Sequence, residues 1–311
     1  MLLKLNKLYF LYKKNIFILF LFLLLNFIQL NGQETKWQNL LHNNNLNEFV
    51  QLNGKANFTL KDGVLIGTSK LNTPNSFLAT KAKYSNFILE FDVLVDNDLN
   101  SGVQFRSESL KNYLNGRVHG YQCEIETSSR RWAGGIYDEA RRGWLYPLSR
   151  NKTGQEAFIR GIWNKYRIEA IGNSIKTFIN GVEVSNLFDD MTQEGFIAFQ
   201  VHGISNPEQE GKQVRWKNIR ILITDLERNR MIALNKAPHI SYLDGTLTQE
   251  EKRLGFRMLW DGKTTNGWRG AKMTIFPEKG WEIKDGILTV QASEGKESRN
   301  GGDIVTIKSF R

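Results

Sequence analysis

The sequence is poor in cysteine and histidine, and each scarcity excludes a class of protein or site. Its 311 residues contain a single cysteine, Cys123, so no disulfide framework can form within the chain. The four histidines show no metal-ligand spacing, and no second cysteine is available, so structural zinc is not indicated. Cys123 lies in a strand pattern, where we expect it to be a small buried apolar residue.

Basic residues exceed acidic ones, but they form no block. The formal net charge is +10, and residues 1–32 contribute four lysines and no acid, so the remainder carries about +6. This remaining excess is scattered, whereas nucleic-acid-binding proteins usually show a basic stripe or cluster. We therefore expect no nucleic-acid partner.

The N-terminus has the composition of a targeting segment. Four lysines precede an apolar run over residues 16–30, which at 15 residues is short for a membrane span. A basic region followed by such a run is typical of a signal peptide. We expect residues 1–32 to be removed and the protein to be secreted or periplasmic, without stable membrane insertion after cleavage. A retained membrane anchor is the alternative.

Residues 35–226 have an all-β pattern. Short alternating apolar and polar runs are interrupted by Gly, Asn or Asp about every ten residues, as in sandwiches and barrels. Asp62-Gly63 and Asn180-Gly181 predict hairpin turns, because glycine adopts positive φ without steric cost. We predict one β-sandwich here. Its inward-facing residues should include Phe91, Val103, Phe105, Ile125, Ile168, Phe199 and Val201.

One stretch of this region returns near the end of the chain. TLKDGVLIG at residues 59–67 matches EIKDGILTV at residues 282–290, and the flanking residues also agree in order. We interpret this as a second copy of the domain over residues 255–311, truncated after its third predicted strand. Three strands leave apolar faces and strand edges exposed, so we expect this segment not to fold alone. Two unrelated Asp-Gly hairpins are the alternative.

A linker over residues 227–254 should join the two copies. Its end, LTQEEKRLGF, predicts a short helix with Thr248 as N-cap and Gly255 as the stop.

Three of the expected strands carry long polar side chains on one face and apolar side chains on the other. Side chains alternate along a strand, so the polar residues of SGVQFRS, GYQCEIE and GFIAFQVHG should point away from the core. A solvated outer face is the alternative, although such faces are usually rich in Thr, Ser and Lys. The polar set is Gln104 and Arg106, then Gln122, Glu124 and Glu126, then Gln200 and His202.

A long loop at residues 128–148 adds four arginines and several aromatic rings. Aromatic planes suit the apolar face of a sugar ring, and polar side chains beside them suit its hydroxyl groups. A phosphate-binding loop is the alternative, but no helix pattern follows Gly134-Gly135 to supply a dipole. The loop residues that we assign to a sugar site are Trp132, Tyr137, Arg141 and Trp144.

Glu124 and Glu126 share a strand face, as the acid and the nucleophile of a glycosidase could. Jelly-roll retaining glucanases have a third carboxylate a few residues further on. Here the chain continues as Thr-Ser-Ser-Arg, which disfavours a two-carboxylate mechanism.

Taken together, the motifs resemble the 3-keto-disaccharide hydrolase domain family, often found in secreted bacterial proteins. The matching stretches include KDGVLIG, SGVQFR, GYQCEIE, GGIYDEARRGWLYP, GFIAFQVHG and VRWKNIRI, and they cover residues 37–226 in order. The stretch LTQEEKRLGFRMLWDGKTTNGW resembles the start of a second, truncated member. The resemblance implies a concanavalin A-like jelly roll and hydrolysis of glycosides oxidised to a ketone at C3.

A ketone at C3 acidifies the proton on C2, so a base can form an enolate that expels the C1 substituent before water adds. Such a route needs a base, donors for the enolate oxygen and an acid for the leaving group. Glu124 or His202 suits the base, and Arg106 with Gln104 suits the enolate. The acid could be His119 or Tyr137. The other candidates for substrate binding are Gln122, Glu126, Trp132, Arg141, Trp144 and Gln200.

We expect no cofactor and one partner, an oxidised disaccharide or glycoside substrate. A divalent cation held by Glu124, Glu126 and His202 is a minority alternative for stabilising the enolate. The other candidate function is a non-catalytic, lectin-like carbohydrate-binding module, because one fold hosts many functions.

Overall fold

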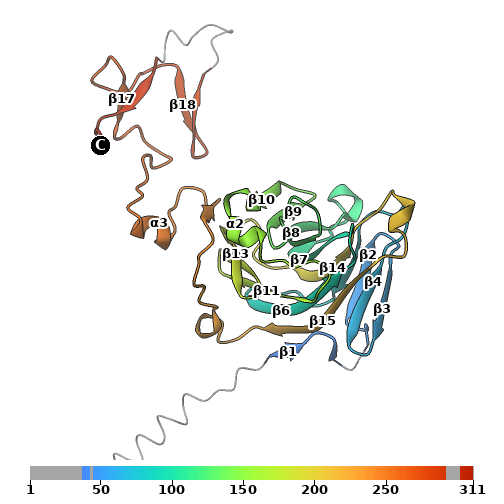
Figure 1. Ribbon diagram of the computed structural model, residues 1–311. Coiled ribbons are helices and arrows are strands. Elements are labelled where there is room, and N and C mark those ends of the chain that lie inside the picture. Colours follow the sequence, from blue (N-terminus) through green and yellow to red (C-terminus); the bar gives the residue numbers. More distant parts are fainter. Residues whose placement is uncertain (1–36, 43–44, 292–301, 311) are drawn as a thin grey trace, which may run out of the picture.

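A computed structural model describes residues 37–42, 45–291 and 302–310. Two large, almost wholly antiparallel sheets lie face to face and form a sandwich (Figure 1). The predicted signal peptide lies outside the described residues. Within the described ranges, no helix is long and apolar enough to cross a membrane.

One sheet has seven strands in the order β10-β9-β8-β7-β14-β5-β2. Strands that are distant in sequence pair here, since β14 lies between β7 and β5. The strands are β2 (Phe49–Asn53), β5 (Ser76–Thr80), β7 (Asn100–Glu108), β8 (His119–Glu126), β9 (Ile136–Glu139), β10 (Gly143–Tyr146) and β14 (Phe196–Val201).

The facing sheet has nine strands, with β16-β13-β12-β11-β6-β15-β4-β3 in order and β1 paired to β15. Its pairs are antiparallel except for β13 with β16. The strands are β1 (Gln38–Asn39), β3 (Asn57–Lys61), β4 (Val64–Thr68), β6 (Phe87–Val95), β11 (Asn164–Ile171), β12 (Ser174–Ile179), β13 (Val182–Phe188), β15 (Gln213–Leu222) and β16 (His239–Ser241).

The core lies between these sheets and contains the residues that alternation predicted. All seven predicted inward-facing side chains are buried in one cluster, none with more than 2% of its surface exposed. The Phe199 ring lies 5.4 Å from that of Trp216 and 6.4 Å from that of Phe91, so it joins the two sheets. Cys123 is also fully buried there. The predicted all-β sandwich is confirmed.

The helical segments of the described residues are short. They are η2 (Leu114–Gly116), η3 (Leu148–Arg150), α2 (Lys152–Gln155), η4 (Pro207–Gln209), η5 (Glu227–Asn229) and α3 (Gln249–Arg253). The last has Thr248 at its N-cap in a capping box with Glu251. Gly255 follows with a φ of +87°. The predicted start and stop of this helix are therefore confirmed.

Both Asp-Gly stretches form hairpins. Asp62 and Gly63 have φ of +52° and +74°, and Asp285 and Gly286 have +50° and +75°. The second hairpin joins β18 (Trp281–Lys284) to β19 (Ile287–Val290), and β17 (Trp268–Gly270) pairs with β20 (Ile304–Thr306). That residues 255–311 are a second copy of the domain stays a prediction.

The segment after β15 is more than a linker. Arg167 of β11 donates to the Asn229 carbonyl, and the Met231 amide donates to the Glu169 carboxylate at 2.7 Å. The Ala237 amide donates to Glu183 at 3.2 Å, and β16 then extends the sheet beside β13. Residues 227–241 therefore form a strap along the nine-stranded sheet.

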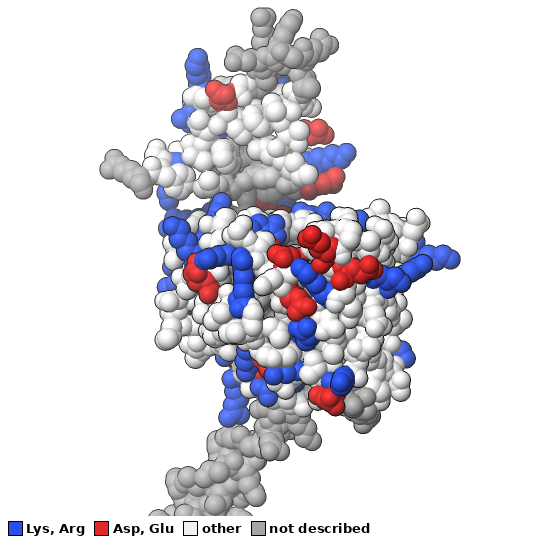
Figure 2. Space-filling view, turned by 45° about the vertical axis from the view of Figure 1, so that its right-hand side comes forward, with Lys and Arg blue, Asp and Glu red and all other residues white. Residues whose placement is uncertain are grey.

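Acidic and basic side chains lie interspersed on the face shown in Figure 2. Several charges of the described residues form ion pairs, such as Arg215 with Asp96 at 3.0 Å and Arg142 with Asp189 at 2.8 Å. Positive charge on the face in view is thus mixed with negative charge.

Candidate functional site

A cavity of about 280 Å³ opens on the side of the seven-stranded sheet that faces away from the core. Strands β7, β8, β9, β10 and β14 supply much of its lining, and loops complete it. The lining residues are Asn75, Asn100, Arg117, Gln122, Glu124, Arg130, Tyr137, Glu139, Trp144, Gln200 and His202.

Glu124 is one of two buried carboxylates that line this cavity, with 3% of its surface exposed against 5% for Glu139. Asn100 Nδ2 donates to Oε1 at 2.5 Å, Gln122 Nε2 donates to Oε2 at 2.9 Å, and Arg130 Nη2 lies 3.9 Å from Oε1. Burial raises the pKa of Glu124 to about 7 in spite of the hydrogen bonds from Asn100 and Gln122, which lower it. Glu124 can therefore exchange a proton near neutral pH.

Three glutamine amides form a row beside Glu124. The Nε2 atoms of Gln104 and Gln200 both donate to Gln122 Oε1, at 2.7 and 2.9 Å. Gly102 of β7 lies opposite Glu124 in the ladder, and a Cβ atom added there would lie 2.5 Å from Cδ of Gln122. The glycine thus leaves the space in which Gln122 lies against the sheet and reaches Glu124.

Arg130 and two aromatic rings form one wall of the cavity. The guanidinium carbon lies 4.7 Å from the centre of the Trp144 ring and 4.6 Å from that of Trp132. The Tyr137 and Trp144 rings are 5.2 Å apart. Tyr137 and Trp144 line the cavity, whereas Trp132 packs against Trp144 at 4.8 Å without lining it. The cation is held against the rings and within reach of the cavity.

Glu126 holds the loop that carries Arg130. It accepts hydrogen bonds from Arg130 Nη2 at 2.7 Å, the Trp132 amide at 2.5 Å and Ser128 Oγ at 3.0 Å. The predicted substrate-binding residue Glu126 does not line the cavity. Its oxygens are occupied by the loop, so the structure gives it a positioning role.

His202 follows β14 and is exposed at the cavity. Its Nδ1 lies 2.7 Å from the Gly203 carbonyl oxygen and donates to it, because a carbonyl can only accept. This contact leaves Nε2 for proton exchange. The structure thus brings Gln122, Glu124, Gln200 and His202 together, with Gln104 bonded behind Gln122.

Arg106 was predicted on the same face, and this placement is wrong. A β-bulge interrupts the β7–β8 register beside it, and its φ is +45°, so regular alternation ends there. Its guanidinium donates to the Ser85 carbonyl at 2.6 Å, the Gly172 carbonyl at 2.9 Å and Asn86 Oδ1 at 3.2 Å. Arg106 ties loops together and does not line the cavity.

Two further predicted residues also lie outside the lining. The His119 ring packs on the Tyr113 ring at 4.2 Å. Arg141 donates to Asp138 Oδ1 at 2.7 Å and to Thr192 Oγ1 at 2.6 Å. Alternation along a strand predicts which face a side chain is on but not how far it lies from the site. His119 and Arg141 both lie where a strand meets a loop.

Several lining residues had no signal strong enough to be predicted. Asn100 begins β7, Glu139 ends β9, and Asn75 and Arg117 come from loops. Arg130 belongs to the arginine-rich loop, but its sequence neighbours do not distinguish it from the other three arginines. Contacts between strands that are distant in the sequence bring these residues to the cavity.

The alternative of a divalent cation finds little support in the geometry. In the part of the chain that the structure describes, no three His, Cys, Asp or Glu side chains gather as metal ligands. Glu126 turns to Arg130 and its loop, so it does not join Glu124 and His202.

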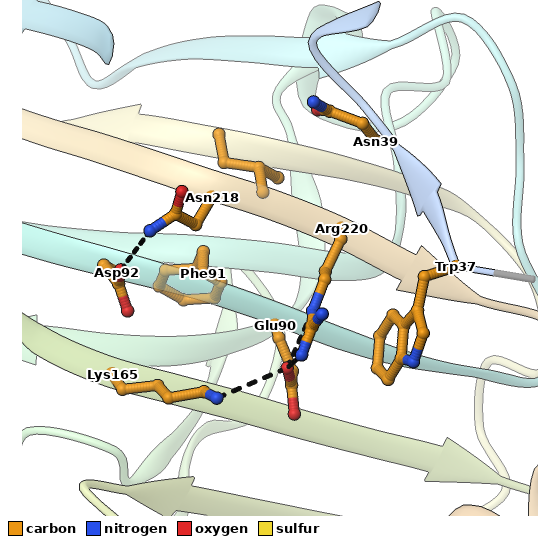
Figure 3. A pocket seen from close by; sticks show the side chains of 9 residues that line it. Trp37, Asn39, Glu90, Phe91, Asp92, Lys165, Asn218 and Arg220 are labelled. Carbon is orange, nitrogen blue, oxygen red and sulfur yellow. Dashed lines mark hydrogen bonds and ion pairs between the residues drawn. The ribbon is translucent and has the colours of Figure 1, made fainter. Parts of the chain in front are cut away.

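A larger cavity of about 490 Å³ lies on the outer face of the nine-stranded sheet (Figure 3). Its charged groups satisfy one another: Arg220 Nη2 and Lys165 Nζ lie 2.6 and 3.6 Å from Glu90 Oε2. Asn218 donates to Asp92 at 2.6 Å. Hydrogen bonds from Arg220 and Arg167 outweigh the effect of burial and lower the pKa of Glu90, which makes it a weak base. We therefore assign the candidate active site to the cavity of Glu124.

Comparison with known families finds one match over most of the sandwich. The sequence model of the 3-keto-alpha-glucoside-1,2-lyase-like domain family matches residues 36–222. A 3-keto-disaccharide hydrolase from Bacteroides thetaiotaomicron is 39% identical over 59 residues, which is 18% of this chain and 20% of that protein. The match thus spans about a fifth of the length of this curated relative.

Solved structures that align with this chain share little sequence with it. A candidate glycosyl hydrolase from Parabacteroides distasonis has 16% identity and a TM-score of 0.44, covering 62% of this chain and 98% of that one. A carbohydrate-binding module from Bacillus subtilis has 15% identity and a TM-score of 0.40, covering 56% and 95%. A Bacillus subtilis protein with a galectin-like fold has 8% identity and a TM-score of 0.45, covering 60% of this chain and 94% of that one.

Proposed function

The chain belongs to the 3-keto-alpha-glucoside-1,2-lyase-like domain family, and on this premise we propose that it hydrolyses glycosides oxidised to a ketone at C3. Glu124 carries the proposal. It is a buried carboxylate in a polar cavity, and its pKa of about 7 suits a general base at neutral pH. The amides and aromatic rings around it suit the hydroxyl groups and the ring face of one sugar.

In the first step Glu124 accepts the proton from C2. The electron pair of the C2–H bond forms the C2–C3 double bond, and the ketone oxygen becomes an enolate. We propose that Arg130, rather than Arg106, stabilises this oxygen, because Arg130 lines the cavity with a guanidinium 3.9 Å from Glu124. A cation held against two rings needs little reorganisation when the negative charge develops.

In the second step the ketone re-forms, a C1–C2 double bond appears, and the electron pair of the C1–O bond leaves on the glycosidic oxygen. His202 is the proposed acid for that oxygen, because Nε2 can exchange a proton while Nδ1 stays bonded to Gly203. Water then adds its oxygen to C1 and gives a proton to His202, and Glu124 returns its proton to C2. The net reaction is hydrolysis, and Glu124 ends in its starting protonation state.

We further propose that the protein is secreted or periplasmic. The basic segment and apolar run in residues 1–32 support this. Fractionation of expressing cells, with sequencing of the mature N-terminus, tests it.

The activity is tested with the full chain and a 3-keto-glucoside, following release of the leaving group. Wild type should turn the substrate over, and Glu124→Gln should lose about 10²–10⁴ in kcat, the usual contribution of a general base. Glu90→Gln is the matched control, a buried carboxylate in the cavity of the other sheet, and should keep its activity. Full turnover by Glu124→Gln would refute the assignment. Binding of unoxidised glycans without any turnover would establish a lectin-like module instead.

A further inference from the structure

The cavity of Glu124 adjoins a second compartment of about 620 Å³. The two share Asn75, Arg117, Glu139 and His202, so they form one continuous depression. The other residues that line the second compartment are Asn53, Pro74, Phe77, Leu114 and Asn115.

The second compartment has a more apolar wall than the first. Pro74, Phe77 and Leu114 line it, whereas the cavity of Glu124 has amides, carboxylates and arginines along with its aromatic rings. The Leu114 side chain is 59% exposed, and its φ is +43°, a left-handed conformation that leucine rarely adopts. Asn115 follows with a φ of +55°. An exposed apolar side chain held in a strained backbone beside a cavity points to a functional role.

The loop that carries Leu114 is fastened to its surroundings. Asn53 of β2 donates to the Gly116 carbonyl at 2.9 Å and accepts from the Val118 amide at 2.8 Å. Tyr113 packs on the buried ring of His119 at 4.2 Å. Leu114 is therefore presented on a preformed wall, which lowers the entropy lost when a ligand packs against it.

We infer that the second compartment binds the leaving group of the substrate, and that Leu114 favours leaving groups with an apolar face, such as an aromatic ring. The inference rests on the proposed function, because it takes the cavity of Glu124 as the site of the ketosugar. His202 lines both compartments, so the bond that breaks lies between them. Leu114 is then a specificity-determining residue distant from the proton transfer.

The test compares two substrates of the full chain, p-nitrophenyl and methyl 3-keto-glucoside, which differ only in the leaving group. Leu114→Asn should lower kcat/KM for the p-nitrophenyl compound by about tenfold, the scale of losing part of a leucine contact. For the methyl compound kcat/KM should stay within about twofold of wild type, since methanol does not reach the wall. Asparagine and glycine both tolerate positive φ, so neither substitution should disturb the backbone. Leu114→Gly is the second variant and should change the kinetics in the same way as Leu114→Asn.

Leu110→Asn is the matched control, because Leu110 lies nearby in the chain, is 43% exposed and does not line the compartment. It should leave both substrates unaffected. Suppose that wild type turns over both compounds, and that the Leu114 variants lose kcat/KM equally for both or not at all. The inference is then wrong, and the proposed function still stands. If wild type turns over neither compound, the proposed function fails and the inference fails with it.

Discussion

Glu124 should make the folded protein less stable as the pH rises, and Glu124→Gln should remove that dependence. Its pKa of about 7 in the folded state compares with an ordinary value of 4.5. Between these values the folded state binds the proton more tightly than the unfolded state, so stability falls with rising pH. At 1.36 kcal/mol for each pH unit, the full difference is about 3 kcal/mol above pH 7.

Glutamine keeps the shape of the side chain but never ionises. Its NH₂ group meets a donor from Asn100 or Gln122, which adds a penalty of about 1–3 kcal/mol that does not vary with pH. The informative quantity is therefore the change with pH, not the absolute stability of the variant. The free energy of unfolding of wild type should fall by about 3 kcal/mol relative to Glu124→Gln between pH 4.5 and 8.

Urea unfolding of both proteins at several pH values measures this difference. In thermal melts of a sandwich of this size the same change amounts to roughly 6–12 °C. Glu90→Gln supplies a control of opposite sign, because the pKa of Glu90 is lowered and its stabilising effect is lost as the pH falls. A difference between wild type and Glu124→Gln that stays constant from pH 4.5 to 8 would refute the reasoning.

Three further predictions concern the rate, the site floor and the core. The kcat/KM of wild type should rise as the pH increases toward about 7, because Glu124 loses its proton, and a rise of the same shape in Glu124→Gln would exclude Glu124 as the base. Gly102→Ala should displace Gln122 and lower kcat/KM at least about tenfold in the same assay. A melting curve like that of wild type would show that the loss arises in the site, and unchanged kinetics would contradict the prediction. Phe199→Ala should lower the free energy of unfolding by about 3–5 kcal/mol, and a loss below 1 kcal/mol in urea would contradict its place in the core.

Alternation along strands was sufficient to predict the sandwich and its core. It depends only on the local geometry of an extended chain, so Val103, Phe105 and Ile125 could be assigned to the core without knowing their partners. The same rule put Gln122 and Glu124 on the face where the cavity lies. It failed at Arg106, because a bulge adds a residue to one strand and breaks the period of two.

Loop residues could not be predicted in this way. Arg117 reaches the cavity because its loop is fastened by Asn53, 63 residues before Gly116 in the chain. Asn75 stands beside His202 through pairing of β5 with β14, and it accepts from the Gly203 amide at 2.9 Å. No local pattern encodes such contacts, so five of the eleven lining residues are identified only once the order of the strands is known.

The strap over residues 227–241 affects where the folding unit ends. A chain cut at residue 226, the end of the strand pattern, would lack β16 and leave the outer edge of β13 without its partner. It would also deprive the buried carboxylates of Glu169 and Glu183 of their amide donors. Bare strand edges invite pairing between molecules. Truncation at the boundary suggested by sequence should therefore promote self-association, and extension through β16 should give the monodisperse protein.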